Sequence, residues 1–144
     1  MIGFRGAEAQ LLLPMTRSLV RARRALTGLP GGGGTPLASA LQMAHAQATQ
    51  LRRAGVTPIL VMLSDGRANV TLAGLGGRTQ AQAEAQHWAR AWSQMGHASL
   101  WIDTAPQPDA QAQQLARLMS ARYLPMPQVQ SQRLAQALQD ARPV

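Results

Sequence analysis

The chain has 144 residues, the length of one domain, and a domain of this size buries about two thirds of the surface that its unfolded chain exposes. It contains no cysteine, which excludes disulfides, thiolate metal sites and cysteine nucleophiles and agrees with a cytoplasmic protein. No apolar run approaches the roughly 20 residues that span a bilayer, and no charged-then-apolar leader opens the chain. We therefore expect a soluble protein without membrane insertion.

The net charge of +8 comes from arginine alone, since all 14 basic residues are arginine. Arginine pairs bidentately with carboxylate and phosphate groups, so acidic protein segments, carboxylated ligands and nucleic acid are candidate partners. Biased composition, rich in Ala and Gln, accounts for most of these arginines better than a partner does. One Tyr, one Phe and three Trp provide no stacking platform for bases, so nucleic acid is not expected.

Short strands alternate with amphipathic helices along the chain, which predicts an α/β fold with a mostly parallel sheet. The first two strands, 1–4 and 9–13, are joined by a turn short enough for an antiparallel hairpin. A helix follows over 18–26, with apolar and arginine side chains on different faces, and Gly28 ends it.

A longer helix is predicted to begin after Thr35, which acts as its cap, with Pro36 in the first position and Gly55 beyond its end. The run 57–63 lacks polar alternation, as expected of a strand covered on both faces. We therefore place this strand at the centre of the sheet.

In the second half, Thr79 and Gln82 predict a capping box for a helix through Met95. A short strand, a helix capped by Asp109, another strand and a last helix complete the predicted order, which shows no repeat, linker or second domain. Their predicted ranges are 98–102 for the first of these strands, 121–126 for the second and 131–140 for the last helix.

Asp65 is the strongest single candidate for chemistry, because it follows the apolar run 59–63 and ligands gather at the carboxyl ends of strands in α/β sheets. An Asp-Gly turn is the simpler interpretation of Asp65 alone. Thr35 changes the balance, since the four glycines before it are more than a helix cap needs and suit close approach of backbone to a ligand. Together the two residues predict a site of hard oxygen ligands for Mg²⁺.

Other polar residues carry weaker signals. Asp103 ends a strand and is interpreted as a turn residue rather than a group that supports the site. The three histidines, His45, His87 and His97, lack ligand spacing, and Trp88 with Trp92 indicates core packing. No catalytic triad or pair of carboxylates is found. Without lysine there is no phosphate-binding loop, so the chain itself is not expected to hydrolyse ATP, and no catalytic residue is assigned.

Five segments carry a specific resemblance: 4–9 (FRGAEA), 11–14 (LLLP), 16–19 (TRSL), 29–37 (LPGGGGTPL) and 64–70 (SDGRANV). In this order they resemble the C-terminal part of the D subunits of magnesium chelatases, and the resemblance runs from Met1 to about residue 140.

The resemblance implies a von Willebrand factor A-type (integrin I-like) domain with a metal-ion-dependent adhesion site. In that family the site takes oxygen ligands from three loops, of which the first carries D-x-S-x-S, the second a threonine matching Thr35 and the third an aspartate matching Asp65. The complete subunit also has an AAA+-like module and an acidic, proline-rich linker. It assembles with an ATP-hydrolysing and a porphyrin-binding subunit to insert magnesium into protoporphyrin IX, a step of chlorophyll or bacteriochlorophyll synthesis.

One departure from the family pattern stands out. The sequence begins inside the second strand, so the first, central strand, the D-x-S-x-S loop and the first helix are missing, and 1–144 is expected to be a partial domain. In the family this strand lies between the strands matching 1–4 and 57–63, so its loss is expected to leave unpaired edges and an uncovered apolar face. With only Thr35 and Asp65 as ligands, Mg²⁺ binding is expected to be weak or absent.

By resemblance, the first functional hypothesis is an assembly and regulatory part of the ATP-dependent magnesium chelatase. In this hypothesis ATP is bound by other parts of the complex, and the arginines of the helix 18–26 meet an acidic segment or the ATPase partner. A second hypothesis is a stand-alone von Willebrand A-like module that captures an acidic side chain of a partner. A third is a relative of the cobalt chelatases.

Overall fold

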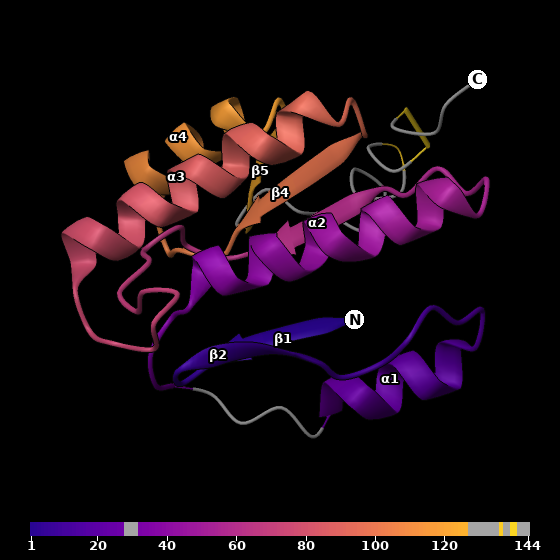
Figure 1. Cartoon of the computed structure of the whole chain (residues 1–144), viewed down its shortest axis with the longest axis horizontal. Coiled ribbons are helices and arrows are strands. Elements are labelled where there is room, and N and C mark those ends of the chain that lie inside the picture. Colours follow the sequence, from indigo (N-terminus) through magenta and orange to yellow (C-terminus); the bar gives the residue numbers. More distant parts are fainter. Residues whose placement is uncertain (28–31, 127–135, 137–138, 141–144) are drawn as a thin grey trace.

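The computed structural model describes residues 1–27, 32–126, 136 and 139–140. Strands and helices follow in the predicted order (Figure 1). The strands are β1 (Ile2–Arg5), β2 (Glu8–Leu11), β3 (Leu60–Leu63), β4 (Ser99–Asp103) and β5 (Arg122–Pro125). The helices are α1 (Leu19–Thr27), α2 (Leu37–Arg53), α3 (Arg78–Gln94) and α4 (Ala110–Leu118). The predicted last helix, 131–140, lies largely outside the described residues.

The strands form two separate sheets. Strands β1 and β2 make an antiparallel hairpin with Ile2 opposite Leu11, as predicted. Strands β3, β4 and β5 make a parallel sheet in that order, with Leu60 opposite Ser99 and Leu100 opposite Arg122. This arrangement confirms the expected α/β class with a parallel sheet.

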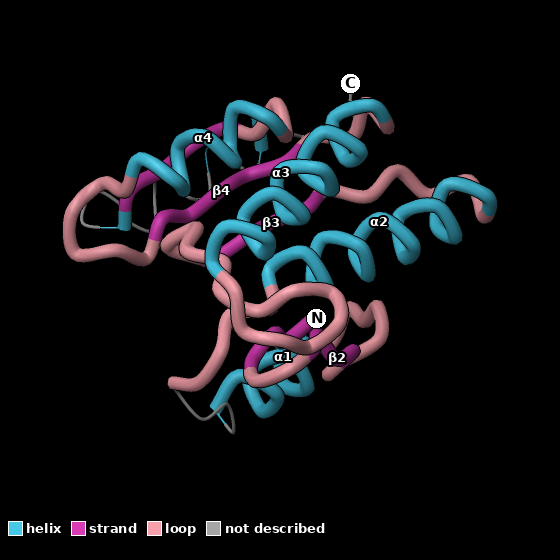
Figure 2. Tube along the Cα trace, turned by 60° about the vertical axis from the view of Figure 1, so that its left-hand side comes forward, coloured by secondary structure: helices cyan, strands magenta, loops and turns pink. Residues whose placement is uncertain are grey.

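Three helices cover these strands from one side. Helix α2 packs against α3 and α3 against α4, while α2 also contacts the hairpin and α4 contacts β4 and β5 (Figure 2). Both α2 and α3 bury small side chains in the core: Ala44 and Ala48 on α2, and Ala81, Ala85 and Ala89 on α3. Trp92 and Trp101, the largest fully buried side chains, fill the space between this helix layer and the sheet.

Strand β3 differs from the prediction. It was expected to be covered on both faces at the centre of the sheet, but it lies at the edge of its three-stranded sheet. Met62 is buried, whereas Val61 is 37% and Leu63 53% exposed. No strand pairs with the free edge of β3 in the described part of the chain, which agrees with the expectation that a missing strand leaves an unpaired edge and an uncovered apolar face.

Within the residues that the structure describes, no helix is both long enough and apolar enough to cross a bilayer.

Candidate metal site between the glycine loop and the β3 end

Two cavities meet at the ends of β1 and β3, and both are lined by Thr35 and Asp65. The smaller cavity has a volume of about 530 Å³ and is mostly polar. Residues from the starts of α2, α3 and α4 and from the loop after β3 surround it: Thr35, Asp65, Arg67, Ala68, Asn69, Arg78, Gln82, Asp109, Ala110 and Gln111. The fold therefore brings together the two residues that the sequence assigned to one metal site.

The loop after β3 holds Asp65 in a defined position. The Ser64 Oγ accepts a hydrogen bond from the Gly66 N–H at 3.0 Å, and Asp65 Oδ1 accepts one from the Arg67 N–H at 3.0 Å. The Trp101 indole N–H donates to the Ser64 carbonyl oxygen at 3.0 Å, which ties the loop to the neighbouring strand β4. One carboxylate oxygen of Asp65 thus orders the turn, and the other makes no hydrogen bond to a described residue.

Thr35 does not cap α2, contrary to the sequence prediction. The helix begins at Leu37 with Pro36 in the capping position, and no side chain donates or accepts a capping hydrogen bond there. Instead, the Thr35 N–H donates to Asn69 Oδ1 at 2.6 Å and the Asn69 N–H donates to the Thr35 carbonyl oxygen at 3.3 Å. These two bonds join the glycine loop (described residues 32–35) to the loop after β3 (64–70, the β3 loop) and leave the Thr35 hydroxyl without a capping role.

The glycine loop is held by backbone packing. A Cβ on Gly34 would lie 2.5 Å from Val70 Cγ2 and 2.7 Å from the Gly6 carbonyl oxygen. The Gly6 N–H in turn donates to the Gly34 carbonyl oxygen at 3.1 Å. Close packing against the β1–β2 turn therefore explains why Gly34 has no side chain, and no ligand is needed to explain it.

An ion pair joins the β3 loop to the start of α4. The Arg67 Nε and Nη2 atoms both donate to Asp109 Oδ2, at 2.9 and 2.7 Å. Asp109 also caps α4 as predicted, because its Oδ1 accepts from the Gln111 N–H at 2.8 Å. The Arg67 side chain is 65% exposed, whereas the Asp109 side chain is 12% exposed. Asp109 thus fixes one side of the cavity and holds Arg67 at its mouth.

This pairing shifts the titration of both groups. Burial raises the pKa of the Asp109 carboxyl, but the hydrogen bonds from Arg67 and Gln111 outweigh burial, so its pKa lies below the ordinary value. The hydrogen bond to Asp109 is the largest of the causes that raise the pKa of Arg67. Asp109 therefore stabilises the fold above the ordinary carboxyl pKa, and this contribution is lost as the pH falls through the lowered value.

Asp103 has a larger role than the predicted turn. It accepts a hydrogen bond from the Ala105 N–H at 2.9 Å, as a turn residue does, but it is also fully buried. Its Oδ2 accepts from the Asp109 N–H at 2.8 Å and from the Tyr123 hydroxyl at 2.5 Å. Asp103 thereby connects β4 and β5 with the start of α4, and through Asp109 with Arg67.

The capping box predicted at the start of α3 is absent. The helix begins at Arg78 after Gly77, and no side-chain cap is present. Gln82 instead accepts a hydrogen bond from the Ala68 N–H at 3.3 Å, while its buried Nε2 has no partner in the described part of the chain. The residues that sequence reasoning did not assign to the site are therefore Asn69, Arg67, Asp109 and Gln82. Only the SDGRANV motif contained a signal, for the first two of them.

The donor set fits a hard cation in kind but is small in number. Thr35 supplies a hydroxyl and Asp65 a carboxylate, both suited to Mg²⁺, which takes oxygen ligands in near-octahedral geometry and keeps several waters. No group of three or more His, Cys, Asp or Glu side chains with metal-binding arrangement occurs among the described residues. Two protein ligands are fewer than this geometry takes, so waters or further ligands would have to complete the set.

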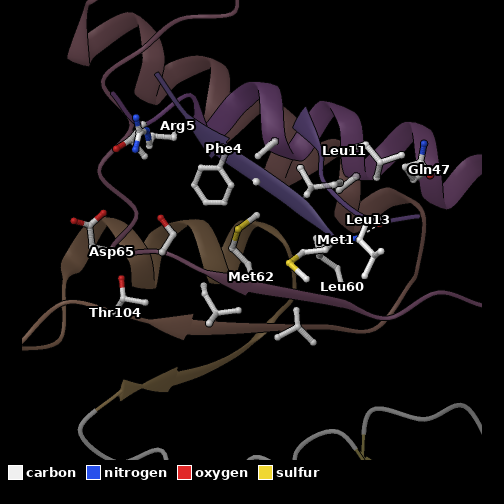
Figure 3. Close-up of a pocket in the computed structure, with 18 of the residues that line it drawn as sticks. Met1, Phe4, Arg5, Leu11, Leu13, Gln47, Leu60, Met62, Asp65 and Thr104 are labelled. Atoms are coloured by element: carbon white, nitrogen blue, oxygen red, sulfur yellow. Dashed lines mark hydrogen bonds between the residues drawn. The ribbon is translucent and has the colours of Figure 1, made fainter. Parts of the chain in front are cut away.

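The larger cavity, of about 830 Å³, is an apolar groove between β1 and β3. Phe4 and Met1 from the hairpin face Leu60 and Met62 from β3 across it, and Asp65, Thr104 and Arg5 lie together at one end (Figure 3). The side chains of α2 complete its lining, including Ala40, Ala44 and Leu51. The groove is thus bordered by a strand on each side and opens toward the candidate metal site at one end.

The remaining sequence assignments concern aromatic residues and histidines. Trp92 is buried and Trp88 packs against the core, as predicted. His45 and His87 make edge-on contacts with Trp88, and His97 lies against Trp92. These contacts give the three histidines packing roles.

Fold and sequence together define the class of the protein. Residues 1–67 match the von Willebrand factor type A domain family. With the parallel sheet and its helix layer, this match confirms the expected von Willebrand factor A-type fold.

The particular relatives are magnesium-chelatase subunits. The chain is 43% identical over 138 residues to the magnesium-chelatase 60 kDa subunit of Cereibacter sphaeroides and 44% identical over 138 residues to that of Rhodobacter capsulatus, in each case over 96% of this chain and 25% of the relative. It is 38% identical over 147 residues to the 67 kDa subunit of Chlorobaculum parvum, over 95% of this chain and 24% of the relative. The resemblance to magnesium-chelatase subunits is confirmed, and the chain spans about a quarter of the length of these curated relatives.

Proposed function

We propose that the chain is an assembly and regulatory part of the ATP-dependent magnesium chelatase that inserts Mg²⁺ into protoporphyrin IX in chlorophyll or bacteriochlorophyll synthesis. It acts there as a metal-dependent protein-interaction module in the cytoplasm, without ATPase activity or catalytic residues of its own. The observation that carries the proposal is the joining of the Thr35 and Asp65 loops through Asn69 at one cavity, in a chain similar over 96% of its length to magnesium-chelatase subunits.

The groove between β1 and β3 supports the proposal that 1–144 is a partial domain. Both bordering strands have apolar side chains, and the groove of about 830 Å³ ends beside Asp65. We propose that one more strand, carrying D-x-S-x-S at its end, lies in this groove in the complete subunit. It would pair with the free edge of β3 and supply the third set of oxygen ligands.

When Mg²⁺ is bound, it supplies a positive centre that accepts a carboxylate of a partner subunit. Thr35 and Asp65 hold the ion, and Asn69 keeps their loops together. Arg67 and Asp109 keep the β3 loop against α4. Each of these roles is positioning or binding, which agrees with an absence of bond-making in this chain.

Helix α1 is the surface proposed for the ATP-hydrolysing subunit or an acidic segment. Its nine residues are fewer than the roughly 12 that an isolated helix needs for marginal stability in water. Leu19 is 85% and Val20 69% exposed. The arginine side chains on or next to α1 are exposed and form no hydrogen bond or ion pair with a described residue: Arg17, Arg21, Arg23 and Arg24.

Reversing two of these charges, Arg21→Glu with Arg24→Glu, is expected to weaken binding to the ATP-hydrolysing subunit about tenfold at low salt, a loss of about 1.4 kcal/mol. The loss should shrink as salt is added, because the Debye length falls from about 30 Å at 0.01 M to about 3 Å at 1 M. Biolayer interferometry with the separate subunits measures this dependence.

The matched control is Arg52→Glu with Arg90→Glu, an equal charge change on exposed positions of α2 and α3. We expect assembly of this control to match that of the unchanged chain. Unchanged assembly of the α1 variant, or an equal loss in both variants, removes α1 from the interface.

A further inference from the structure

The polar cavity beside Thr35 and Asp65 carries two arginines that a metal site alone does not need. Arg67 and Arg78 both line it, from the loop after β3 and from the first position of α3. We propose that they form a second carboxylate subsite, so that this face binds an acidic peptide segment with two carboxylates. One carboxylate would meet the metal and the other the two arginines. This inference rests on the proposed metal-dependent binding function.

The arginines have donors to spare. A guanidinium group carries five N–H donors in a planar fork, and only Nε and Nη2 of Arg67 bond to Asp109. The exposed Arg78 side chain forms no hydrogen bond or ion pair with any described residue. A carboxylate that enters the cavity therefore finds one arginine already oriented by Asp109 and a second without a partner.

The surrounding charges favour an anion. Asp109 is paired with Arg67, and bound Mg²⁺ would neutralise Asp65, which leaves Arg78 as excess positive charge. The starts of α2, α3 and α4 also line the cavity, and none has an acidic residue in its first turn. Because helix N-termini carry partial positive charge, they add to the attraction. The carboxylate subsite is assigned to the arginines with free donors and not to the helix ends.

Gln82 supplies a further polar group at the same place. Its Oε1 is used by the Ala68 N–H, while its buried Nε2 lacks a partner among the described residues. A donor of this kind costs about 1–3 kcal/mol when it stays unpaired. Because this nitrogen is closed to solvent, the Gln82 side chain would have to rotate before an incoming peptide carbonyl or carboxylate could satisfy it. The cavity volume of about 530 Å³ lies within the range of about 300–1,000 Å³ typical of binding pockets.

The test uses the full chain and three fluorescent glycine-serine peptides of equal length, which carry two adjacent glutamates, one glutamate beside one glutamine, or two glutamines. Fluorescence anisotropy gives the affinities, in EDTA and in Mg²⁺ at a concentration high enough to load a site with only two protein ligands. In Mg²⁺ the two-glutamate peptide is expected to bind about tenfold more tightly than the one-glutamate peptide, the order of one charge-assisted hydrogen bond.

Arg78→Gln is the main variant, because Arg78 makes no contact that the described fold depends on. It should bring the ratio between the two acidic peptides close to one. Arg90→Gln is the matched control, with the same charge change on the same helix about 18 Å away along its axis, and it should keep the ratio. Arg67→Gln, checked for folding by circular dichroism, should lower the ratio as Arg78→Gln does.

The subsite is overturned if the two acidic peptides bind with equal affinity or if no peptide binds. It is also overturned if Arg78→Gln and Arg90→Gln lose the same affinity. Displacement of the peptide by an equimolar single-stranded oligonucleotide overturns it as well. Peptide discrimination that depends on Arg78 but not on Mg²⁺ or Asp65 supports the subsite and contradicts the proposed metal dependence. The two proposals can therefore fail separately.

Discussion

Gly66→Ala is expected to lower the free energy of unfolding by about 3 kcal/mol, among the largest effects of a single methyl group in this chain. Gly66 has a φ of +77°, and a Cβ there would lie 2.5 Å from the Ala112 N and 2.6 Å from the Ala112 Cα. Both atoms belong to the backbone of α4, so relief requires the β3 loop or the helix to move. Urea denaturation measures the loss, and the same movement would displace Asp65.

Gly55→Ala separates the clash from backbone strain. Gly55 has a similar φ of +74°, but a Cβ there meets nothing within 4 Å. Its substitution should therefore cost only the left-handed backbone term of about 1–2 kcal/mol. If the two variants lose the same stability, the close packing of Gly66 on α4 is not what holds the β3 loop in place.

Asp103→Ala is expected to lower the free energy of unfolding by about 3–4 kcal/mol. Asp103 is fully buried and accepts from Ala105, Asp109 and Tyr123, so its removal leaves buried donors unpaired at about 1–3 kcal/mol each. Ser120→Ala offers a control, because its hydroxyl pairs with Ser93 at the exposed surface and should cost less than about 1 kcal/mol. Similar losses in the two variants would contradict the structural role of Asp103.

The same network gives a pH dependence that one chromophore reports. Burial first, and then the hydrogen bond to Asp103, raise the pKa of Tyr123 from its ordinary 10.0 to about 12. The pKa of Tyr123 is higher in the folded than in the unfolded chain. Its contribution to the stability of the fold is therefore complete below about pH 10 and is lost as the pH rises through about 12. Tyr123 is the single tyrosine, so tyrosinate absorbance follows it directly, and Asp103→Asn should move the midpoint toward 10. An unchanged midpoint would contradict the assigned contact.

The sequence predicted the helices and strands better than it predicted which elements lie next to them in the fold. Periodic apolar residues located α2 and α3, and the alternation of strands and helices predicted the parallel sheet. The predicted central position of β3 was wrong. An all-apolar run shows that both faces of a strand can be buried, but it does not show whether another strand pairs with each of its edges. Val61 and Leu63 are exposed here, where the family pattern places another strand.

The residues of the candidate site also fall into those that the sequence predicted and those that it did not. Thr35 and Asp65 were predicted from motif and strand position, and the fold brings them to one cavity. Local capping rules assigned the wrong roles to Thr35 and Gln82, because both make contacts with the β3 loop that lie 14 or more residues away in the chain. The Arg67–Asp109 pair spans 42 residues, and no local pattern indicates such a partner. Capping of α4 by Asp109, which depends only on neighbouring residues, was predicted correctly.

These contacts give the proposed module a consistent design. Asn69 joins the two loops proposed to bind metal, Gly66 packs the second of them on α4, and Asp109 with Asp103 connects that loop to β4 and β5. The groove between β1 and β3 is the part that this chain leaves open. We propose that Thr35 and Asp65 belong to two of three ligand loops, and that the third loop enters with the strand that fills the groove.

The most direct measurement is an Mg²⁺ titration of melting temperature in two proteins. One is the chain itself, and the other is a chimera in which the segment preceding the matched region of the Cereibacter sphaeroides relative is fused to its N-terminus. We predict a rise of about 5–10 °C in the chimera at an Mg²⁺ concentration 100-fold above its Kd. That rise should be absent in Asp65→Ala and in Thr35→Ala, and the chain alone should change by less than about 1 °C. A rise of equal size in the chain alone, or one in the chimera that survives Asp65→Ala, would contradict a site built from three loops.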